Sequence, residues 1–460
     1  MSVRNGEYSF LALFLFACKQ NRFSVNNKID FYERFFDMTE EKIFEKDKTA
    51  RAVLVSVIPK GADEREYEVS FDELARLADT AEAQVVARLT QQKENPDVRT
   101  YIGKGKVEEL ARLCENNDID LVIFDDELSP SQIRNVEDDL GGNVRVIDRS
   151  MLILDIFALH AVTGEGKTQV ELAQLKYTVP RLTGKGTELS RLGGGVGTRG
   201  PGESKLETDR RHIKRRIAAL EEDIKEMEKN RATQRLQRDR TGIFKIAIAG
   251  YTNAGKSTLL NYLTGAGILA EDKLFATLDP TTRKFTLPGG EDVLLTDTVG
   301  FIRRLPHQLV NAFRSTLDEV KYADALLVVI DSSDPEADSQ GEVSAKLISE
   351  LGAADKPTLF VYNKCDKAEG FIPRTPTAQS FVVSAKTGEG IDALVAKIEE
   401  LSHERAKEYV FLIPASDMGV ISRLYNNTTV KDVEYTENGA IVRAVADAKN
   451  AGIYAKYIKE

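Results

Sequence analysis

The sequence is poor in cysteine. Its 460 residues include only Cys18, Cys114 and Cys365, which are far apart and show none of the spacings of a metal site. So scattered a set offers no disulfide framework and suits a reducing compartment. We therefore expect three free thiols in a cytoplasmic protein.

The sequence also lacks a hydrophobic run long enough to span a bilayer. The one candidate, Phe10 to Cys18, follows Arg4 and resembles the apolar part of a signal peptide. It is too short for a span, and no small-residue cleavage pattern follows it, so we expect no stable membrane insertion. Residues 1–45 are predicted to be a poorly ordered extension, within which Met38 is an alternative start of the functional chain.

An excess of positive charge is missing as well. The formal net charge is -10, which argues against a protein that coats nucleic acid through overall electrostatics, so we expect no DNA partner. With 42% hydrophobic and 30% charged residues, the composition is that of a globular protein. The length predicts roughly two to four domains.

Apolar runs of strand length alternate with amphipathic stretches between residues 46 and 150. This βαβα order implies a parallel sheet. The predicted strands are Val53 to Ile58, Val85 to Leu89, Leu121 to Phe124 and Val144 to Ile147. Ser129, Pro130 and Gln132 predict a helix start with an N-cap, a first-turn proline and a capping box. Residues 101–106 are interpreted as a loop before a helix rather than as a phosphate loop.

A helical hairpin is predicted between residues 151 and 240. Apolar residues recur there at the spacings of a coiled-coil seam, namely at Ile213, Ile217, Leu220, Ile224 and Met227. Their expected partner is the stretch that contains Leu152, Ile156 and Leu159 and continues through Val170 to Leu175. A Gly-rich segment at residues 192–203 is predicted to form a mobile tip.

The tip of this hairpin is rich in positive charge. Residues 181–216 contain ten Lys or Arg against four acidic residues, on a chain of net charge -10. Such segregation favours a phosphate-rich partner, most simply RNA, although charge runs are usually solvated faces. The predicted RNA contacts are Arg191, Arg199, Lys205, Arg210 and Arg211.

A phosphate-binding loop is predicted in a domain that spans residues 241–402. The apolar run Ile243 to Ala249 leads into Gly250-Tyr251-Thr252-Asn253-Ala254-Gly255-Lys256-Ser257, and a helical pattern that starts near Thr258 follows. Glycines at such a turn let backbone N–H groups face phosphates at the helix N-terminus. Lys256 would reach the β and γ phosphates, and Ser257 would bind Mg2+.

Three further motifs follow strand-like runs in the order typical of a guanine-nucleotide site. In Asp297-Thr298-Val299-Gly300, Asp297 can hold Mg2+, commonly through water, and the N–H of Gly300 can sense the γ-phosphate. In Asn363-Lys364-Cys365-Asp366, Asp366 can accept two hydrogen bonds that guanine donates and adenine cannot. Lys364 can lie along the base, Asn363 can tie neighbouring loops together, and the backbone of Ser384-Ala385-Lys386 can meet the guanine O6.

The loop between the first two motifs is the place for a segment that the γ-phosphate and Mg2+ would order. It contains Phe275-Ala276-Thr277-Leu278-Asp279-Pro280-Thr281-Thr282-Arg283. We take Thr277 as the Mg2+ ligand, although spacing leaves Thr281 and Thr282 as rivals. Arg283 is either surface charge or an internal phosphate clamp, and Asp331 is interpreted as a structural carboxylate. The predicted catalytic residues are Lys256, Thr277, Asp297 and Gly300.

Longer strings resemble the HflX type of GTPase, a ribosome-associated branch of the translation-factor-related GTPases. They are EGKTQVELAQL, LGGGVGTRGPGESKLETDRR and FATLDPTTR, and the resemblance runs from residue 46 to the end. It implies that the N-terminal subdomain and the hairpin contact the large ribosomal subunit and its RNA. It further implies a role in rescuing or splitting stalled ribosomes under stress, and it supports Thr277 as the Mg2+ ligand.

The expected fold class is α/β. A P-loop GTPase domain is preceded by the N-terminal parallel-sheet subdomain and the coiled-coil hairpin, and a small α/β domain at residues 403–460 follows. Residues Val433 to Val445 predict a β-hairpin around Asn438-Gly439 in that last domain. We expect a monomer.

Slow intrinsic hydrolysis is predicted from Phe301. It occupies the place where many GTPases carry a water-orienting Gln, and a phenyl ring can neither orient nor polarise water, so a partner is expected to stimulate hydrolysis. Asn253 raises the hypothesis of a K+ ion beside the phosphates. The alternative to a hydrolytic cycle is a nucleotide-gated RNA- or protein-binding scaffold in which hydrolysis is incidental.

Overall fold

The computed structural model describes residues 49–182, 201–241, 243–267, 273–275, 277–304, 314–368, 370–373, 379–404, 407–436, 438–446 and 448–459. The predicted extension at residues 1–45, Arg191, Ala276 and residues 192–200 of the predicted Gly-rich tip, which include Arg199, lie outside these ranges. Residues 201–203, predicted to belong to that tip, instead begin the long helix Pro201–Thr241. Within the described part of the chain, none of the helices combines the length and the apolar character that a membrane crossing needs.

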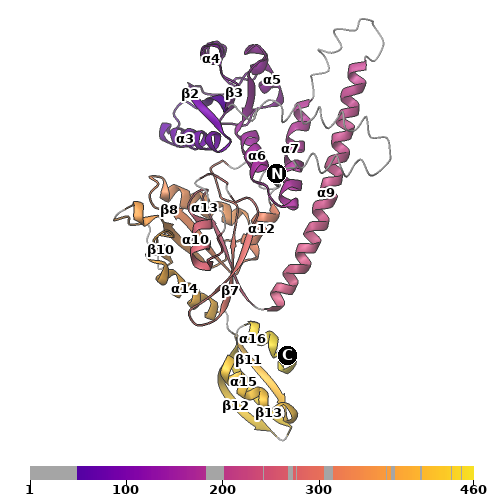
Figure 1. The fold of residues 1–460 in the computed structure, drawn as a ribbon, viewed down its shortest axis with the longest axis vertical. Coiled ribbons are helices and arrows are strands. Elements are labelled where there is room, and N and C mark those ends of the chain that lie inside the picture. The colour runs from indigo at the N-terminus through magenta and orange to yellow at the C-terminus, as the bar shows by residue number, and fades with distance from the viewer. Residues whose placement is uncertain are drawn as a thin grey trace, which may run out of the picture.

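The N-terminal region is a parallel sheet that helices cover on both faces (Figure 1). Its strands pair in the order β2-β1-β3-β4. They are β1 (Ala50–Ile58), β2 (Ala83–Gln92), β3 (Leu121–Phe124) and β4 (Arg145–Asp148). The helices are α3 (Glu64–Thr80), α4 (Lys104–Asn116), α5 (Pro130–Asp139) and α6 (Arg149–His160). The four predicted strands and the capping box at Ser129 are confirmed.

Side chains of β1 alternate between two cores, because successive residues of a strand point to opposite faces. Ala52 and Leu54 belong to the core beneath α3 and α6, which we call the α6-side core, whereas Val53 and Val55 belong to the core beneath α4 and α5. The α6-side core extends into the next domain. Five residues from loops of that domain complete it: Leu274, Phe275, Leu278, Val299 and Ile302.

Helix α7 (Gly164–Thr178) packs against the long helix α9 (Pro201–Thr241). The seam contains Leu172, Leu175, Ile213 and Leu220. The helices are antiparallel, because Glu165 near the start of α7 pairs with Arg231 at 2.8 Å and Lys176 near its end pairs with the earlier Glu221 at 2.7 Å.

The stretch expected to face α9 is divided between two environments. Leu152 and Ile156 of α6 lie in the α6-side core, and Leu159 is exposed. Among the described residues, the buried partners of the seam, Leu172 and Leu175, belong to α7, and Val179 just after α7 packs against them. The physical reason is that the helix is interrupted after α6. Ala161 is the C-cap of α6, and Thr163 is the N-cap of α7.

The central domain is built on a six-stranded sheet of order β10-β9-β8-β5-β7-β6. All neighbours are parallel except β6 and β7. The strands are β5 (Phe244–Gly250), β6 (Thr281–Thr286), β7 (Asp292–Asp297), β8 (Ala325–Asp331), β9 (Thr358–Asn363) and β10 (Ser380–Val382). The helices are α10 (Lys256–Thr264), α12 (Arg314–Tyr322), α13 (Ala337–Glu350) and α14 (Ile391–Glu404).

A small antiparallel sheet with two helices follows. Its strands β11 (Lys407–Pro414), β12 (Thr429–Thr436) and β13 (Gly439–Ala446) pair in the order β11-β13-β12. Helices α15 (Gly419–Asn427) and α16 (Ala448–Ile453) accompany them. The predicted hairpin is confirmed, because β12 and β13 pair antiparallel on either side of Asn438.

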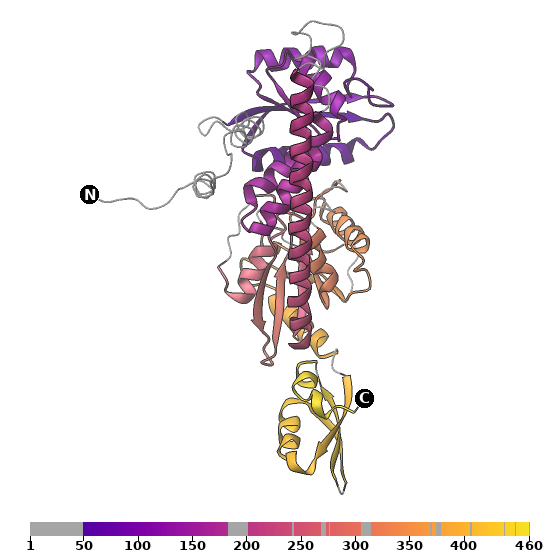
Figure 2. The ribbon, with the colours of Figure 1, turned by 90° about the vertical axis from the view of Figure 1, so that its right-hand side faces the viewer.

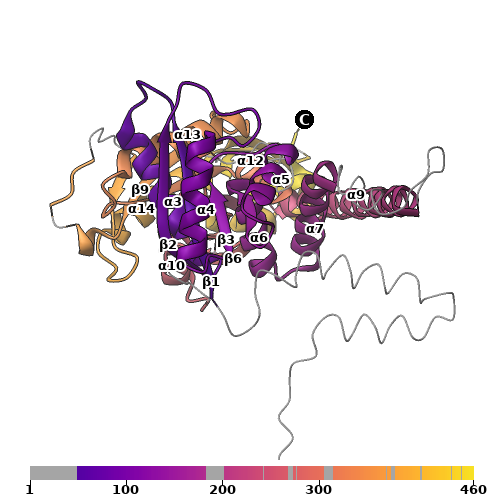
Figure 3. The same cartoon turned by 90° about the horizontal axis from the view of Figure 1, so that it is seen from above.

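The regions are arranged along one axis. The N-terminal sheet and the small C-terminal sheet lie at opposite ends, with the central domain between them (Figure 1). Helix α9 runs along the N-terminal and central domains (Figure 2). Seen from above, the N-terminal domain lies over the central one (Figure 3). The loops at the junction of these two domains contain the residues predicted to bind nucleotide.

Candidate functional site

The predicted phosphate loop connects β5 to α10. It begins at Gly250, whose φ is +132°, and a side chain there would overlap the backbone of Val329. It ends at Gly255, whose φ is +93°, and a side chain there would overlap Asn363. The N-cap of α10 is Gly255, which has no side chain to cap the first turn, so this turn leaves backbone N–H groups without an intrahelical partner beside the loop. Both glycines are thus required by the turn, and the helix end suits an anion.

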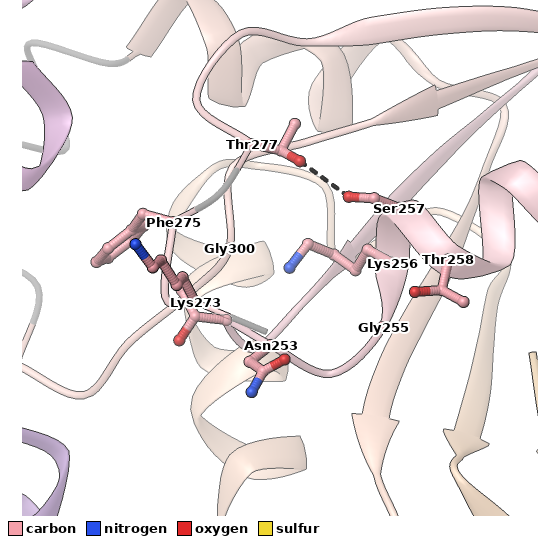
Figure 4. A pocket seen from close by; sticks show the side chains of 10 residues that line it. Asn253, Gly255, Lys256, Ser257, Thr258, Lys273, Phe275, Thr277 and Gly300 are labelled. Atoms are coloured by element: carbon pink, nitrogen blue, oxygen red, sulfur yellow. Dashed lines mark hydrogen bonds between the residues drawn. The ribbon is translucent and has the colours of Figure 1, made fainter. Parts of the chain in front are cut away.

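A cavity lies over this loop (Figure 4). It is lined by Thr252, Asn253, Gly255, Lys256, Ser257, Thr258, Lys273, Phe275, Thr277 and Gly300. All except Lys273 were predicted nucleotide contacts. Lys273 precedes the recognisable motif in a segment without a spacing pattern, so no signal in the sequence singles it out.

Lys256 is buried in this cavity. Its Nζ donates a hydrogen bond to the carbonyl of Tyr251 at 2.8 Å. Burial lowers the pKa of Lys256 to about 8, and the nearby carboxylate of Asp297 opposes that shift. Among the contacts described, the Lys256 ammonium therefore has no direct ion pair. A bound phosphate would supply the negative charge that it lacks.

Ser257, Thr277 and Asp297 meet beside Lys256. The Ser257 Oγ donates to Asp297 Oδ2 at 2.6 Å and lies 2.8 Å from the Thr277 Oγ1 (Figure 4). The Oδ1 of Asp297 is buried and has no hydrogen-bond partner among the described residues. Burial raises the pKa of Asp297, against the effects of Lys256 and of the hydrogen bonds from Ser257 and Thr277. This set of oxygens fits a hard divalent cation, which would bring the partner that Oδ1 lacks.

The two rival threonines lie elsewhere. Thr281 and Thr282 belong to β6, and the hydroxyl of Thr282 lies 3.0 Å from that of Thr296 on the neighbouring strand. Arg283 is exposed and donates to the carbonyl of Thr282. The structure therefore brings Thr277 to Ser257 and leaves Arg283 at the surface.

The segment after Asp297 closes over the phosphate loop. A side chain at Gly300 would lie 2.6 Å from the Thr252 Cγ2 and 2.9 Å from the Lys256 Nζ. The backbone of Phe301 donates to Gly250 and accepts from Thr252, at 2.9 and 2.8 Å. The phenyl ring is buried in the core of the central domain. Thr298 is also buried and donates to the carbonyl of Ile248, so its hydroxyl is structural.

The predicted base-recognition loops are joined to the phosphate loop. Asn363 donates to the carbonyl of Ala254 at 2.9 Å and accepts the N–H of Ala385 at 2.9 Å. Asp366 is exposed and accepts from Ser384 at 2.6 Å; this hydrogen bond lowers the pKa of Asp366. Cys365 and Lys386 flank these groups, and the Cys365 N–H donates to the carbonyl of Val383. The Asp366 carboxylate is thus exposed beside the loops that Asn363 joins to the phosphate loop, although Asp366 is not among the residues that line the cavity.

Asp331, interpreted from the sequence as a structural carboxylate, pairs with Lys364 of the predicted base-recognition motif. Its Oδ2 lies 2.6 Å from the Nζ of Lys364, which also donates to the carbonyl of Asn253 at 2.8 Å. Asp331 therefore fixes the lysine predicted to lie along the base.

Several predicted nucleotide contacts point away from the cavity. The side chains of Phe275, Leu278 and Val299 reach the α6-side core, and Phe275 also borders the cavity. The Asp279 carboxylate binds the start of α7, and the Tyr251 hydroxyl binds Glu73 of α3. These residues join the site to the N-terminal domain, which spacing could not show.

The predicted RNA contacts are only partly described. Arg210 is half-buried and Arg211 is exposed on α9. The side chain of Lys205 lies outside the described residues, as do Arg191 and Arg199.

Four family models match consecutive parts of the chain. They are described as "GTP-binding GTPase N-terminal" over residues 68–158, "GTP-binding GTPase Middle Region" over 160–238, "50S ribosome-binding GTPase" over 245–364 and "HflX C-terminal domain" over 374–451.

Individual relatives match most of the chain. A GTPase HflX of Caldanaerobacter subterraneus is 51% identical over 408 residues, which cover 89% of this chain and 93% of that protein. A GTPase HflX of Escherichia coli is 39% identical over 400 residues, which cover 86% and 93%. A solved structure of a GTP-binding protein from Sulfolobus solfataricus with GDP is 29% identical, covers 76% of this chain and 98% of its own, and has a TM-score of 0.42.

Proposed function

This chain belongs to the HflX family of GTPases, and we propose that it uses GTP hydrolysis to drive a cycle on the large ribosomal subunit. In that cycle it dissociates or rescues stalled ribosomes under stress. The ribosome also implies a cytoplasmic location. The match of residues 245–364 to a family of 50S ribosome-binding GTPases supports this target.

For the hydrolytic step, we propose that Ser257 and Thr277 bind Mg2+ directly and that Asp297 binds it through water. The observation that carries this assignment is the meeting of these three side chains beside Lys256, with one buried oxygen of Asp297 that has no hydrogen-bond partner in the part of the chain that the structure describes. Bound Mg2+ would neutralise charge on the β and γ phosphates. Lys256 would hold the same phosphates, and the backbone N–H of Gly300 would contact the γ-phosphate.

Guanine would be selected by Asp366. Its carboxylate can accept the N1–H and the exocyclic amine of guanine, and Ser384 holds it in place from one side. Lys364 would lie along the base, in the orientation that Asp331 supports. Equal competition of labelled GTP by ATP and by GTP would contradict this assignment.

The ribosome would complete the hydrolytic site. Phe301 is held in the core of the central domain and so provides no group that orients water. A partner that supplies such a group, or that orders the loops, can raise the rate by orders of magnitude. The basic stretch of α9, which includes Arg210 and Arg211, is a proposed contact with ribosomal RNA.

A monovalent ion is a further proposed cofactor. Asn253 borders the cavity and adopts a left-handed backbone conformation with φ of +60°. An amide oxygen there could help hold K+ beside the phosphates. If replacing K+ by Na+ leaves the hydrolysis rate unchanged, both with and without ribosomal subunits, K+ has no role.

The deciding experiment measures GTP hydrolysis in Mg2+ with and without purified large ribosomal subunits. The Lys256→Ala variant serves as the blank, because it lacks the phosphate-binding cation. Strong stimulation that depends on Lys256 supports the ribosome-activated cycle. Tight GTP binding without stimulation would favour the alternative, a scaffold in which the nucleotide only sets the conformation.

A further inference from the structure

The loop around Thr277 joins two distant parts of the molecule. The Thr277 hydroxyl lies in the nucleotide site, 2.8 Å from the Ser257 Oγ. Two residues later, the carboxylate of Asp279 contacts a different part of the molecule. It accepts the backbone N–H groups of Val162 and Thr163 at 3.1 and 2.8 Å, and the Thr163 hydroxyl at 2.5 Å. One carboxylate therefore fixes the loop to the start of α7.

The start of α7 is shaped to receive this carboxylate. Thr163 is the N-cap of the helix, and its hydroxyl accepts the N–H of Gly166 at 2.9 Å while it donates to Asp279. A helix N-terminus also carries a partial positive charge that favours an anion. Gly166 leaves the necessary room, because a Cβ there would lie 2.5 Å from the Asp279 Oδ1.

Apolar contacts hold the loop on both sides of Thr277. Phe275 and Leu278 are buried in the α6-side core. The ring of Phe275 packs edge-on against Phe157 of α6, with 4.7 Å between the ring centres. The residues on either side of Thr277 are therefore held by buried apolar contacts and by the hydrogen bonds of Asp279. These contacts lie outside the group of Ser257, Thr277 and Asp297.

We propose that Asp279, Thr163 and Gly166 are positioning residues for the Mg2+-dependent binding of GTP. They act through Thr277, because they hold the loop where its hydroxyl meets Ser257 and Asp297. The inference rests on the assignment of Thr277 as a Mg2+ ligand under the proposed function. It adds that the start of α7, which is far in sequence from the nucleotide-binding motifs, helps to hold Thr277 at the metal site.

The same contact connects the metal site to α9. Glu165, in the first turn of α7, pairs with Arg231 of α9 at 2.8 Å, and both side chains are about four-fifths covered, with exposures of 20% and 21%. A displacement of α9 would therefore act on the helix end that holds Asp279.

The test measures the binding of GTPγS and of GDP to the full chain at increasing Mg2+ concentration, so that its outcome does not depend on turnover. Asp279→Asn removes the charge that the three donors bind. Gly166→Ala pushes the carboxylate away, while alanine favours the helix more than glycine does. For both variants we expect the Mg2+ concentration that half-saturates GTPγS binding to rise about tenfold, and GDP affinity to change less than twofold.

Matched variants separate this effect from a general loss of structure. Thr163→Ser keeps the hydroxyl and should behave like the parent protein. Thr168→Val should also do so, because Thr168 lies on the same helix and its hydroxyl binds only the carbonyl of Gly164 among the contacts described. Thr277→Ala is the reference for complete loss of the ligand, and it should show the largest rise in the Mg2+ requirement.

Two results would overturn the inference. The first contradicts the positioning role alone, and the second also contradicts the proposed Mg2+ ligands. If Thr277→Ala raises the Mg2+ requirement but Asp279→Asn and Gly166→Ala stay within twofold of the parent, the start of α7 does not position Thr277. If Thr277→Ala itself has no effect, the proposed Mg2+ ligand set is wrong and the positioning role is wrong with it.

Discussion

The hydroxyl of Tyr251 connects the phosphate loop to the N-terminal domain, since it donates to Glu73 of α3 and accepts the backbone N–H of Arg303 at 2.8 Å. Glu73 also pairs with Arg149, which binds Asp125 at 2.8 Å. The side chains of Arg149, Glu73 and Asp125 have exposures of only 3%, 2% and 0%. A residue of the phosphate loop is therefore part of a buried ionic network in the neighbouring domain.

Tyr251→Phe should destabilise the junction between these domains. It leaves one oxygen of Glu73 and the N–H of Arg303 without their hydrogen-bond partner, which costs about 1–3 kcal/mol when the groups are buried. Urea denaturation of the full chain measures the change. Tyr425→Phe is the control, because that ring is 59% exposed, and it should change the free energy of unfolding by less than about 0.5 kcal/mol. Equal effects of the two substitutions would show that the Tyr251 hydroxyl contributes nothing.

GTP binding should weaken as the pH rises above 8. The pKa of Lys256 is lowered to about 8 by burial, and the cation is the form that binds phosphate, so the empty protein loses this form with rising pH. We expect the Kd for GTP to increase about tenfold between pH 7 and pH 9. The γ-phosphate adds little to this change, because its last proton is lost near pH 6. Titration calorimetry in two buffers with different ionisation heats should detect proton uptake at pH 9, and a constant Kd would refute the prediction.

The stability of the empty protein should change in the opposite direction with pH. The pKa of Lys256 is lower in the folded chain, at about 8, than its ordinary value of 10.5. The unfolded chain therefore binds more protons between these values, and the contribution of Lys256 to the free energy of unfolding increases as the pH rises through that interval. Lys256→Met should flatten the pH dependence of the urea midpoint over the same interval.

Asp331→Asn should reduce the affinities for GTP and GDP by the same factor. The substitution removes the charge that holds the Lys364 ammonium, which is 2.6 Å away, and both nucleotides present the same base to Lys364. We expect a loss of about threefold to tenfold and an unchanged kcat. Fluorescent GDP and GTP analogues measure the affinities, with Asp292→Asn at the edge of β7 as the control. A loss confined to GTP would place Asp331 in the γ-phosphate response instead.

Asp366→Asn should change which base is bound. The amide no longer accepts both hydrogen bonds from guanine, so GTP affinity should fall by at least about a hundredfold. Xanthine carries a carbonyl in place of the guanine amine, and an asparagine amide can donate to it. Competition of a labelled nucleotide by GTP, XTP and ATP should show a gain for XTP over the parent protein. If the variant still prefers GTP strongly, another residue selects the base.

The strands and the phosphate end of the site could be predicted from the sequence because both depend on local patterns. Apolar runs predict buried strands, and residues that follow parallel strands meet at one edge of the sheet. Asp297 and Asn363 therefore lie near the loop that contains Lys256. Spacing left Thr281 and Thr282 as rivals of Thr277, since all three follow the same helix, and the family resemblance supported the choice of Thr277.

The contacts between domains could not be predicted in this way. Tyr251 and Glu73 are 178 residues apart, and Asp279 and Thr163 are 116 residues apart, so no spacing relates them. Phe275 and Leu278 occur in a string that resembles a nucleotide-binding loop. That resemblance gives no indication that their side chains pack into the α6-side core. Leu152 and Ile156 were assigned to the wrong partner because a helical apolar pattern does not say which surface covers it.

The shared core has a consequence for the synthesis of the chain. Residues from Ala52 to Tyr177 supply most of the α6-side core, but Leu274 and Ile302 complete it. At a translation rate of about 5–20 residues per second, the last of these emerges roughly 6 to 25 seconds after the end of α7 at Thr178. During that interval the part of the α6-side core that these later residues cover stays open to solvent, and transiently exposed apolar surface of this kind favours aggregation.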